Sequence, residues 1–396
     1  MSEPVEDPPG AAFAAALAGL PGMGPATLVG ILRRWAPEEA WAGVCDGSLR
    51  RPEGRGGSGA PEQLDLSDDG GGPPRRSKPG WRDPARRLDP PGWWARMASQ
   101  GIRVTWPGQP TYPRALEADP QPPGVLFWRG SLEWLQLPCV ALVGTRRASP
   151  DGRAVAFEIG RDLAAAGVCV VSGLALGIDA AAHLGALGAR DRAGSAGPVG
   201  VAASAVDVPY PRRNAGLWQR VVGAGAVLSE NLPGRPAQAW RFPSRNRVIA
   251  GLVQMVVVVE SHATGGSLIT AEAAIARGVD VRVVPGPVHS PASVGSNQLL
   301  YDGPGPVRNA QDVLDGLGLF LSPANDGAAP STSPSDNLGA EARTVLEAVG
   351  WRPTSLNQIV ERAGLTAART MAVLDELEAR GLVGCHHDGW VRRRSS

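Results

Sequence analysis

Short hydrophobic runs alternate with segments of helical spacing through the centre of the chain. The runs predicted to be strands are residues 140–143, 168–171, 199–203, 226–228, 255–259 and 281–284. The segments predicted to be helices are residues 152–166, 177–187, 213–222, 245–251 and 266–277. Because the strand runs are continuously apolar rather than alternating, we expect both faces of the sheet to be covered. The pattern predicts an α/β fold with a Rossmann-like, doubly wound and mostly parallel sheet.

Two smaller modules flank this central domain. Residues 10–46 are rich in alanine with helical spacing, which predicts a small N-terminal helical domain. Its turn L-P-G-M-G-P-A-T at 20–27 resembles that of a helix-hairpin-helix, whose backbone amides can hold a phosphate; the alternative is a helical packing module without DNA contact. Residues 338–393 predict three helices followed by a short hairpin, the element order of a winged helix.

Glycine and proline divide the chain into these modules. The chain has 52 glycines and 37 prolines, and stretches rich in glycine, proline or serine occur at 47–91 and 322–337. Such segments bury too little apolar surface to offset the entropy of ordering. We therefore interpret both as linkers, the first of them disordered, and assign the central domain to residues 92–320.

Charge and composition exclude several classes of protein. The 39 basic and 38 acidic residues leave a net charge of +1, which argues against a protein that coats polyanions by bulk charge. The longest apolar run, residues 252–259, is far shorter than the roughly 20 residues of a membrane helix. The N-terminus lacks the positive region of a signal peptide, and the four cysteines are scattered. We expect a cytoplasmic protein without membrane association, bound metal or cofactor.

Glycine and hydroxyl residues gather in the loops that follow the predicted strands. These loops read G-T-R-R-A-S at 144–149, S-G-L-A-L-G-I-D at 172–179, E-S-H-A-T-G-G-S-L-I-T at 260–270 and P-G-P-V at 285–288. Each loop alone is compatible with close packing. Together they fall at the carboxyl edge of one sheet, where ligands bind and where helix N-termini attract anions. They predict a phosphate site, with Arg146 or Arg147 as the forked cation.

Two further arginines flank an asparagine in F-P-S-R-N-R at 242–247, at the start of a predicted helix. This group can grip a phosphate and a base edge, although a solvated helix end is the alternative. A dinucleotide enzyme is disfavoured, because no G-x-G-x-x-G follows the first strand and no Walker A lysine occurs. Asp179 and His183 lie four residues apart on one predicted helix, and without a nearby nucleophile we interpret that pair as structural.

The motifs closely resemble those of the DNA-processing protein A (DprA, or Smf) family. The resemblance spans about 92–316 and rests on S-G-L-A-L-G-I-D-A-A-A-H-L-G-A-L at 172–187, P-Y-P at 209–211, F-P-S-R-N-R-V-I-A-G at 242–251, G-S-L-I-T-A at 266–271, P-G-P-V at 285–288 and G-S-N-Q-L-L-Y-D-G at 295–303. It implies a homodimeric protein without catalytic activity. Such a protein binds and protects single-stranded DNA and helps load the RecA recombinase in natural transformation or recombination.

The resemblance also implies which residues contact the single strand. Carried over by motif, they are Gly144, Arg146, Ser172, Gly173, Arg245, Asn246, Arg247, Gly266, Ser267, Thr270 and Asn297. Direct contact is expected above all from Arg146, Arg245 and Arg247. Leu176 departs from the family pattern, because an arginine is usual at that position, and its presence removes one cation from the site.

Two other functions compete with this one. The first is a nucleotide-processing hydrolase of the LOG type, because residues 265–272 resemble the G-G-x-G-T-x-x-E loop of that class. Leu268 and Ile269, however, occupy the second glycine and the threonine positions. The second is a sequence-specific repressor that uses the winged helix. The third helix of that module carries Asp375, Glu376 and Glu378, so we expect it to contact protein rather than DNA.

Overall fold

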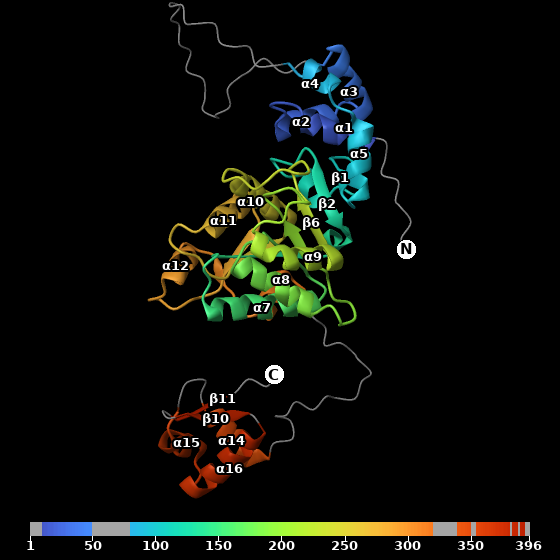
Figure 1. Ribbon diagram of the computed structural model, residues 1–396. Helices are drawn as coiled ribbons and strands as arrows, with labels where there is room; N and C mark the ends of the chain where they lie inside the picture. The colour runs from blue at the N-terminus through green and yellow to red at the C-terminus, as the bar shows by residue number, and fades with distance from the viewer. Residues whose placement is uncertain are drawn as a thin grey trace, which may run out of the picture. The chain divides into compact units, whose positions relative to one another are not determined.

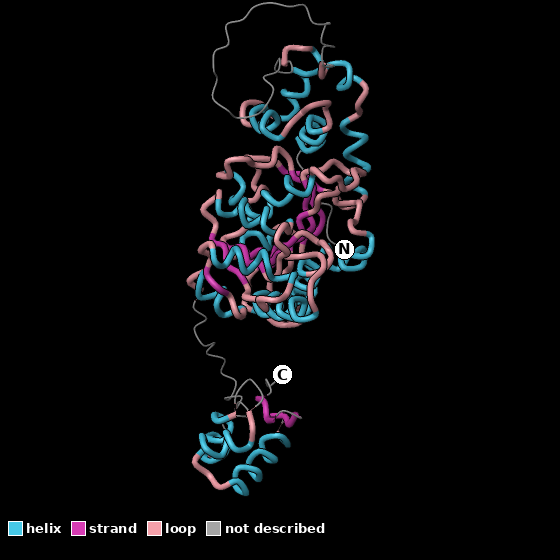
Figure 2. Tube along the Cα trace, turned by 90° about the vertical axis from the view of Figure 1, so that its left-hand side faces the viewer, coloured by secondary structure: helices cyan, strands magenta, loops and turns pink. Residues whose placement is uncertain are grey.

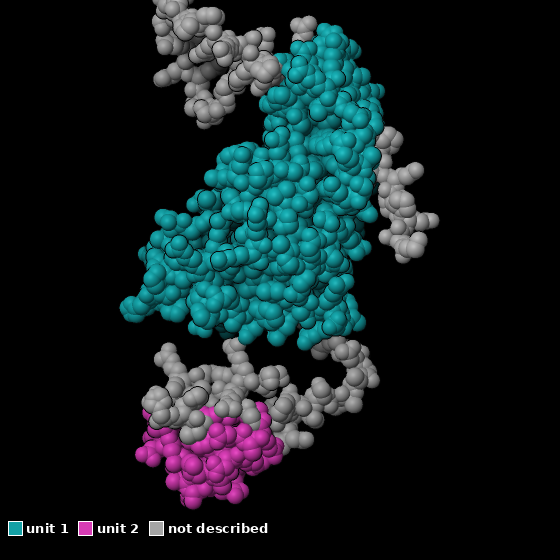
Figure 3. Space-filling model, viewed as in Figure 1, with its two compact units in different colours: residues 1–321 teal, residues 322–396 magenta. Residues whose placement is uncertain are grey.

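The computed structural model describes residues 10–49, 80–319, 339–349, 354–380, 382–386 and 389–392. They fall into two compact units, one within residues 1–321 and the other within residues 322–396 (Figure 3). The predicted linker at 322–337, and residues 50–79 of the predicted linker at 47–91, lie outside the described residues. In the described parts of the chain, no helix is both long enough and apolar enough to span a membrane.

One sheet organises the first unit. Its strands are β1 (Arg103–Thr105), β2 (Leu126–Gly130), β3 (Cys139–Val143), β4 (Cys169–Ser172), β5 (Val199–Val201), β6 (Ala226–Ser229), β7 (Met255–Val258), β8 (Asp280–Val283) and β9 (Gly305–Pro306), in the order β1-β2-β6-β5-β4-β3-β7-β8-β9. All neighbours from β6 to β9 are parallel, whereas β1 pairs with β2 and β2 with β6 in antiparallel fashion. The predicted Rossmann-like, mostly parallel sheet is confirmed.

Helices cover both faces of the sheet, as the continuous apolar runs predict (Figures 1 and 2). On one face lie α7 (Pro150–Ala165) and α8 (Ile178–Gly188), with α9 (Ala215–Ala224) beside α8; on the other lie α10 (Arg241–Leu252) and α11 (Gly266–Ile275). Successive residues of β3 alternate between the two cores. Val140 and Leu142 pack with α7 and α8, while Ala141 and Val143 pack with α10 and α11.

The N-terminal helices are α1 (Gly10–Ala18), α2 (Pro25–Leu32), α3 (Pro37–Asp46), α4 (Arg82–Arg86) and α5 (Pro90–Ser99). The prediction that the linker extends to residue 91 is wrong, because the chain from Trp81 onward is folded against α1–α3. The Trp81 indole is buried, and its Nε1 donates to the Pro21 carbonyl oxygen at 3.2 Å. Ala85 is buried as well, and Arg82 Nε donates to the Cys45 carbonyl oxygen at 3.2 Å, so several contacts anchor this segment.

This helical group shares its core with the edge of the sheet. Leu17 of α1 and Trp41 of α3 belong to one buried cluster with Val104 of β1 and Phe127 of β2. Three short helices complete the unit: α6 (Arg114–Glu117), α12 (Val294–Tyr301) and α13 (Ala310–Gly316). The N-terminal helices therefore extend the central domain rather than forming a separate module in this unit.

The second unit is a winged helix, as predicted. It contains α14 (Ala340–Ala348), α15 (Leu356–Ala363), α16 (Ala367–Ala379) and the antiparallel pair β10 (Val383–His386) and β11 (Gly389–Arg392). Helix α15 begins at a capping box in which the Ser355 hydroxyl accepts from the Gln358 amide, and it ends at Gly364 with φ 66°. Val345, Ile359 and Leu374 form the centre of its core.

Candidate nucleic-acid interface

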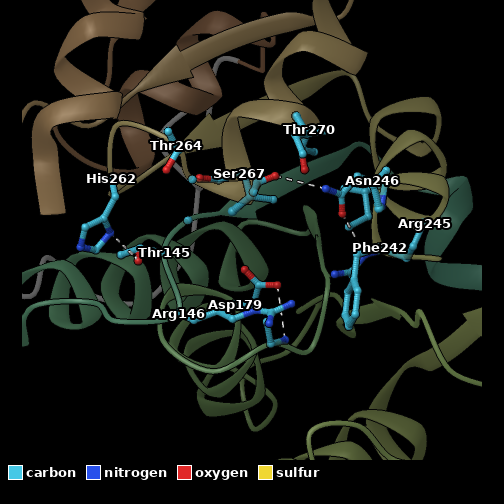
Figure 4. A pocket seen from close by; sticks show the side chains of 18 of the residues that line it. Thr145, Arg146, Asp179, Phe242, Arg245, Asn246, His262, Thr264, Ser267 and Thr270 are labelled. Carbon is cyan, nitrogen blue, oxygen red and sulfur yellow. Dashed lines mark hydrogen bonds between the residues drawn. The ribbon is translucent and has the colours of Figure 1, made fainter. Parts of the chain in front are cut away.

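A cavity of about 420 Å³ opens beyond the carboxyl ends of β3 and β7. These neighbouring strands mark the point where the winding of the sheet reverses, which is where open α/β sheets bind ligands. The walls are the loop after β3, the loop after β7, and the first turns of α10 and α11. Figure 4 shows Thr264, Ser267 and Thr270 on one side of the cavity, and Arg146 with Asp179 on the opposite side.

Glu260 ties the two strand loops together. Its carboxylate accepts from the Ser149 amide at 2.9 Å and from the Ser149 hydroxyl at 2.6 Å, and its backbone carbonyl accepts from the Thr145 amide at 2.7 Å. The same Ser149 hydroxyl caps α7 by accepting from the Gly152 amide at 2.9 Å. Because these bonds link β3 and β7 across the switch point, the mouth of the cavity is held in shape before any ligand arrives.

The α11 side of the cavity presents a helix N-terminus and hydroxyl groups. Gly266 begins α11, and no side chain of Gly265 or Gly266 covers the amides of the first turn. The Ser267 hydroxyl donates to Ser261 Oγ at 2.9 Å, and Thr145 Oγ1 lies 3.0 Å from His262 Nδ1. The positive end of a helix dipole together with hydroxyl donors suits an anionic oxygen.

Arg245 forms the floor of the cavity, and its predicted contact with a single strand stays a prediction. Its guanidinium donates from Nη1 to the carbonyl oxygens of Gly173 at 2.5 Å and Val201 at 2.6 Å, and from Nε to Asn246 Oδ1 at 3.0 Å. Only 7% of the residue is exposed. Burial lowers the pKa of Arg245 to about 10, and the charge of Asp179 opposes that shift, so the side chain stays protonated at neutral pH.

Asn246 follows Arg245 and joins the floor to the α11 wall. Its Nδ2 donates to the Gly266 carbonyl oxygen at 3.2 Å, and its Oδ1 is taken by Arg245. Both polar ends of the side chain are therefore engaged within the protein. Asn246 lines the cavity but serves first to hold Gly266, and with it the start of α11, against α10.

Arg247 does not line this cavity, and its predicted contact with DNA stays a prediction. Its Nη2 pairs with Glu230 Oε1 at 2.5 Å, and its Nη1 donates to the Gln121 carbonyl oxygen. Helix α10 begins at Arg241, four residues before the predicted start at 245, so both arginines lie within it. Residues two apart on a helix are separated by roughly 200°, which sends Arg245 and Arg247 to different faces.

Ser172 and Asn297 also lie outside the cavity. The Ser172 hydroxyl is fully buried and donates to the Leu142 carbonyl oxygen at 2.6 Å, which joins β4 to β3. The Asn297 amide accepts from the Gly286 N–H and donates to the Gly286 carbonyl oxygen, each at 3.1 Å. Both residues shape the loops around the site without facing a ligand there.

Gly144 and Gly173 are required by close packing. A Cβ on Gly144 would lie 2.5 Å from Ile178 Cγ1, at the start of α8. A Cβ on Gly173 would overlap the guanidinium of Arg245. The sequence predicts these glycines as contact positions; in the structure they let α8 and the floor arginine approach the strand ends.

Asp179 stabilises the loop after β4. Its carboxylate is buried and accepts from the amides of Gly173 at 3.1 Å and Ala175 at 3.4 Å. Burial raises the pKa of Asp179, and the charge of Arg245 opposes the rise. His183, one turn further along α8, is fully buried; its ring nitrogens have no hydrogen-bond partner among the described residues, and burial lowers its pKa to about 4. The two side chains are structural, as the sequence predicts.

Arg146 is an exposed cation at the rim. Its guanidinium carbon lies 4.8 Å from the centroid of the Phe242 ring, and the Phe242 and Tyr210 rings lie 5.7 Å apart at 55°. A smaller pocket of about 90 Å³ lies beside this group and is lined by Leu176. Cation and ring faces are thus presented side by side at the mouth of the cavity.

The structure brings together most of the predicted contact residues. Gly144, Arg146, Arg245, Asn246, Gly266, Ser267 and Thr270 line the cavity, whereas Ser172, Gly173, Arg247 and Asn297 do not. Sequence reasoning did not single out Phe242, Tyr210 or His262. Phe242 and Tyr210 lie in the F-P-S-R-N-R and P-Y-P segments. In both segments an aromatic residue stands close to arginine in the sequence, a pattern that can indicate a nucleic-acid contact.

The ionisable groups of the cavity favour an anion. Three arginines, Arg146, Arg147 and Arg245, line it against the single carboxylate of Asp179. Arg146 and Arg147 are exposed. In the part of the chain that the structure describes, no cluster of three His, Cys, Asp or Glu side chains gathers at a possible metal site.

Two family models match the chain: DNA recombination-mediator protein A over residues 103–318, and the DprA winged helix domain over residues 329–389. Protein Smf of Synechocystis sp. is 32% identical over 309 residues, covering 70% of this chain and 76% of that protein. Protein Smf of Escherichia coli is 33% identical over 289 residues, covering 72% and 75%. The X-ray structure of DNA processing protein A from Streptococcus pneumoniae has a TM-score of 0.53 at 33% identity, covering 59% of this chain and 80% of that one.

Proposed function

Because the chain belongs to the DNA recombination-mediator protein A family, we propose that it binds single-stranded DNA at the switch-point cavity and protects the strand. The observation that carries this proposal is the rim, where Arg146 lies over Phe242 with Tyr210 beside it. A single strand offers unstacked bases and flexible phosphates together, so one nucleotide can use both the rings and the cation.

The phosphate is expected at the α11 side of the cavity. There the start of α11 at Gly266 and the side chains of Thr264 and Ser267 face Arg146 across an opening that Glu260 holds in shape. The base is expected on the ring faces of Phe242 and Tyr210. A cavity of about 420 Å³ is the size of a small-ligand site and accepts one nucleotide.

The way in which the polar groups are used supports binding rather than catalysis. The Asp179 carboxylate is occupied by two backbone amides, and Arg245 and Asn246 are bonded within the protein. A hydrolase of the LOG type would need Glu272 at the reacting bond, but Glu272 is exposed on α11 and is not among the residues lining the cavity. A single-strand contact needs only cations, amides and ring faces, which the rim supplies.

The direct test is the affinity of the full chain for single-stranded and duplex oligonucleotides of equal length and the same sequence. We expect the single strand to bind more tightly by tenfold or more, because paired bases are not available to Phe242 and Tyr210. Equal affinity for both, or tighter duplex binding, would reject the site. Release of free base from nucleoside monophosphates would instead support the hydrolase.

We further propose that the chain forms a homodimer and helps load the RecA recombinase. The family description names recombination mediation, and large apolar side chains are exposed near the C-terminal end of the sheet: Val288 is 78%, Val294 47% and Tyr301 87% exposed. Light scattering tests the dimer, and a monomeric mass at micromolar concentration would reject it. The rate at which RecA filaments form on strands already coated with this protein tests the loading.

The winged helix is proposed to contact protein rather than DNA. Arg369, in α16, and Arg380, directly after it, each form an ion pair. Arg369 Nε lies 2.7 Å from Glu341 Oε2, and Arg380 Nη2 lies 2.6 Å from Glu376 Oε1. Removing residues 338–396 should therefore change single-strand affinity less than about threefold, measured by fluorescence anisotropy. A loss of tenfold or more would place DNA contact in this unit.

A further inference from the structure

A second cavity, of about 290 Å³, lies beyond the carboxyl ends of β5 and β6. Val201 ends β5 and Ala202 follows that strand, and Glu230 follows β6. Another wall comes from the N-terminal helices, where Met23 lies in the glycine-containing turn before α2 and Pro25 begins that helix. The turn that resembles a helix-hairpin-helix therefore faces a cavity at the same edge of the sheet as the proposed single-strand site.

The two cavities are separated by one side chain. Arg245 lines both of them, because its guanidinium crosses from the loop after β4 to the end of β5. Ligand atoms on either side of Arg245 are therefore only one side chain apart, which is a spacing that successive nucleotides of one strand can bridge. The first turn of α10 carries residues of both cavities, with Phe242 on the first and Trp240 and Arg241 on the second.

Trp240 is unusually exposed for a side chain of its size. It is 64% exposed, and its ring lies 4.9 Å from the guanidinium carbon of Arg241. The indole Nε1 donates to Gln238 Oε1 at 3.0 Å, which fixes the orientation of the ring. Trp240 is thus an exposed ring with a hydrogen bond on its indole nitrogen and a cation beside it. Phe242 and Arg146 form a similar pair of ring and cation at the first cavity.

Arg241 has hydrogen-bonding capacity that the protein does not use. Its Nη1 donates to the Pro236 carbonyl oxygen at 2.5 Å, while its Nε is buried without a partner among the described residues. Burial lowers the pKa of Arg241, and the neighbouring charge of Arg235 lowers it further. An anionic oxygen beside the Arg241 guanidinium would offset the repulsion between the two arginines.

The charges around the second cavity match those of the first. Arg241, Arg245 and Arg247 line it against Glu230, which is itself paired with Arg247. The cavity thus combines an excess of cations with one exposed ring and an apolar wall from the N-terminal helices. That composition fits a nucleotide better than an apolar ligand, which would leave the cations unpaired.

We propose that the second cavity binds the adjoining part of the same single strand, with a base stacked on Trp240 and a phosphate beside Arg241. The N-terminal helices then form one wall of a continuous channel, and the footprint of the protein is longer than the first cavity alone provides. This inference rests on the proposed single-strand binding and extends it to the N-terminal helices.

The test uses the full chain and oligothymidylates of increasing length. Trp240→Ala should leave the affinity for the shortest strands that bind unchanged and should weaken binding of longer strands about tenfold, the loss of one stacked base. Trp240→Phe, which keeps a ring, should restore most of that affinity. Trp35→Ala is the matched control, since Trp35 is 39% exposed and lines neither cavity, and it should bind like the wild type at every length.

The outcomes separate the two proposals. If the wild type fails to bind single strands, the proposed function itself fails. If the wild type binds and Arg146→Ala weakens binding, but Trp240→Ala matches the wild type at all lengths, then only the second-cavity proposal is overturned. An equal loss at every length would also overturn it, because Trp240 would then act on the first cavity. Unchanged thermal unfolding of Trp240→Ala confirms that the fold is intact.

Discussion

The rim and the floor of the first cavity are each built around an arginine, but the two arginines have opposite surroundings. Arg146 is exposed and lies against an aromatic ring, whereas Arg245 is buried and donates to two backbone carbonyl oxygens and to Asn246. The rim arginine is therefore free to meet a ligand, and the floor arginine joins β4, β5 and α10. Both residues are arginines. The proposed ligand contact differs from the structural support in whether its guanidinium is already hydrogen-bonded within the protein.

We expect a substitution in the floor of the cavity to lower the free energy of unfolding more than a substitution at the rim. Arg245→Ala leaves the carbonyl oxygens of Gly173 and Val201 without their donor and opens a void beneath the cavity, so we expect the free energy of unfolding to fall by about 3 kcal/mol or more. Chemical denaturation measures it. Arg146→Ala, the matched change at the rim, should cost less than about 0.5 kcal/mol. Equal stability of the two variants would remove the distinction between rim and floor.

The buried side chain of His183 makes the free energy of unfolding depend on pH. Its pKa falls from 6.5 to about 4 on folding, so between these values the unfolded chain binds more protons than the folded one. The free energy of unfolding should thus decrease as the pH falls from 6.5 to 4, by about 3 kcal/mol for this group alone. The raised pKa of Asp179 acts in the opposite direction.

Comparing the wild type with His183→Leu isolates the histidine contribution, because Asp179 titrates in both. We expect the difference in unfolding free energy between the two proteins to change across that pH range and to be constant above pH 7. Parallel pH profiles for the two proteins would show that His183 does not titrate as its burial requires.

The rim should respond to charge without loss of stability. Leu176 lines the small pocket beside Arg146 and Phe242. Leu176→Arg should raise single-strand affinity by about three- to tenfold at low salt, since it adds one cation within reach of a bound phosphate. Leu176→Gln, polar but uncharged, is the control. An equal gain from glutamine would show that charge is not the cause.

The sequence predicts the central sheet well, because its parallel strands are buried on both faces and form continuous apolar runs. It misses β1, β2 and β9, of which β1 and β9 span only three and two residues and are too short to show a period. It also misses the folded segment from Trp81, whose order comes from contacts with Pro21 and α1–α3, far away in the chain. Such contacts leave no local pattern.

The sequence predicts where the candidate site lies but not the directions in which its side chains point. Glycine-rich loops after β3, β4 and β7 converge at one edge, as the rule for open α/β sheets requires. The direction of Arg245 and Arg247, however, depends on where α10 begins, and a start at Arg241 turns one inward and the other toward Glu230. Phe242 gains its role only because the chain brings it beside Arg146.

The central claim is that the exposed rim arginine holds a phosphate of single-stranded DNA. It is tested most directly by the single-strand affinity of the wild type and Arg146→Gln across a salt series. We predict that Arg146→Gln binds about tenfold more weakly at low salt and that its log–log salt dependence is shallower by about 0.7, the value for one phosphate contact on a single strand. Unchanged affinity and an unchanged slope in a folded Arg146→Gln protein would contradict the account.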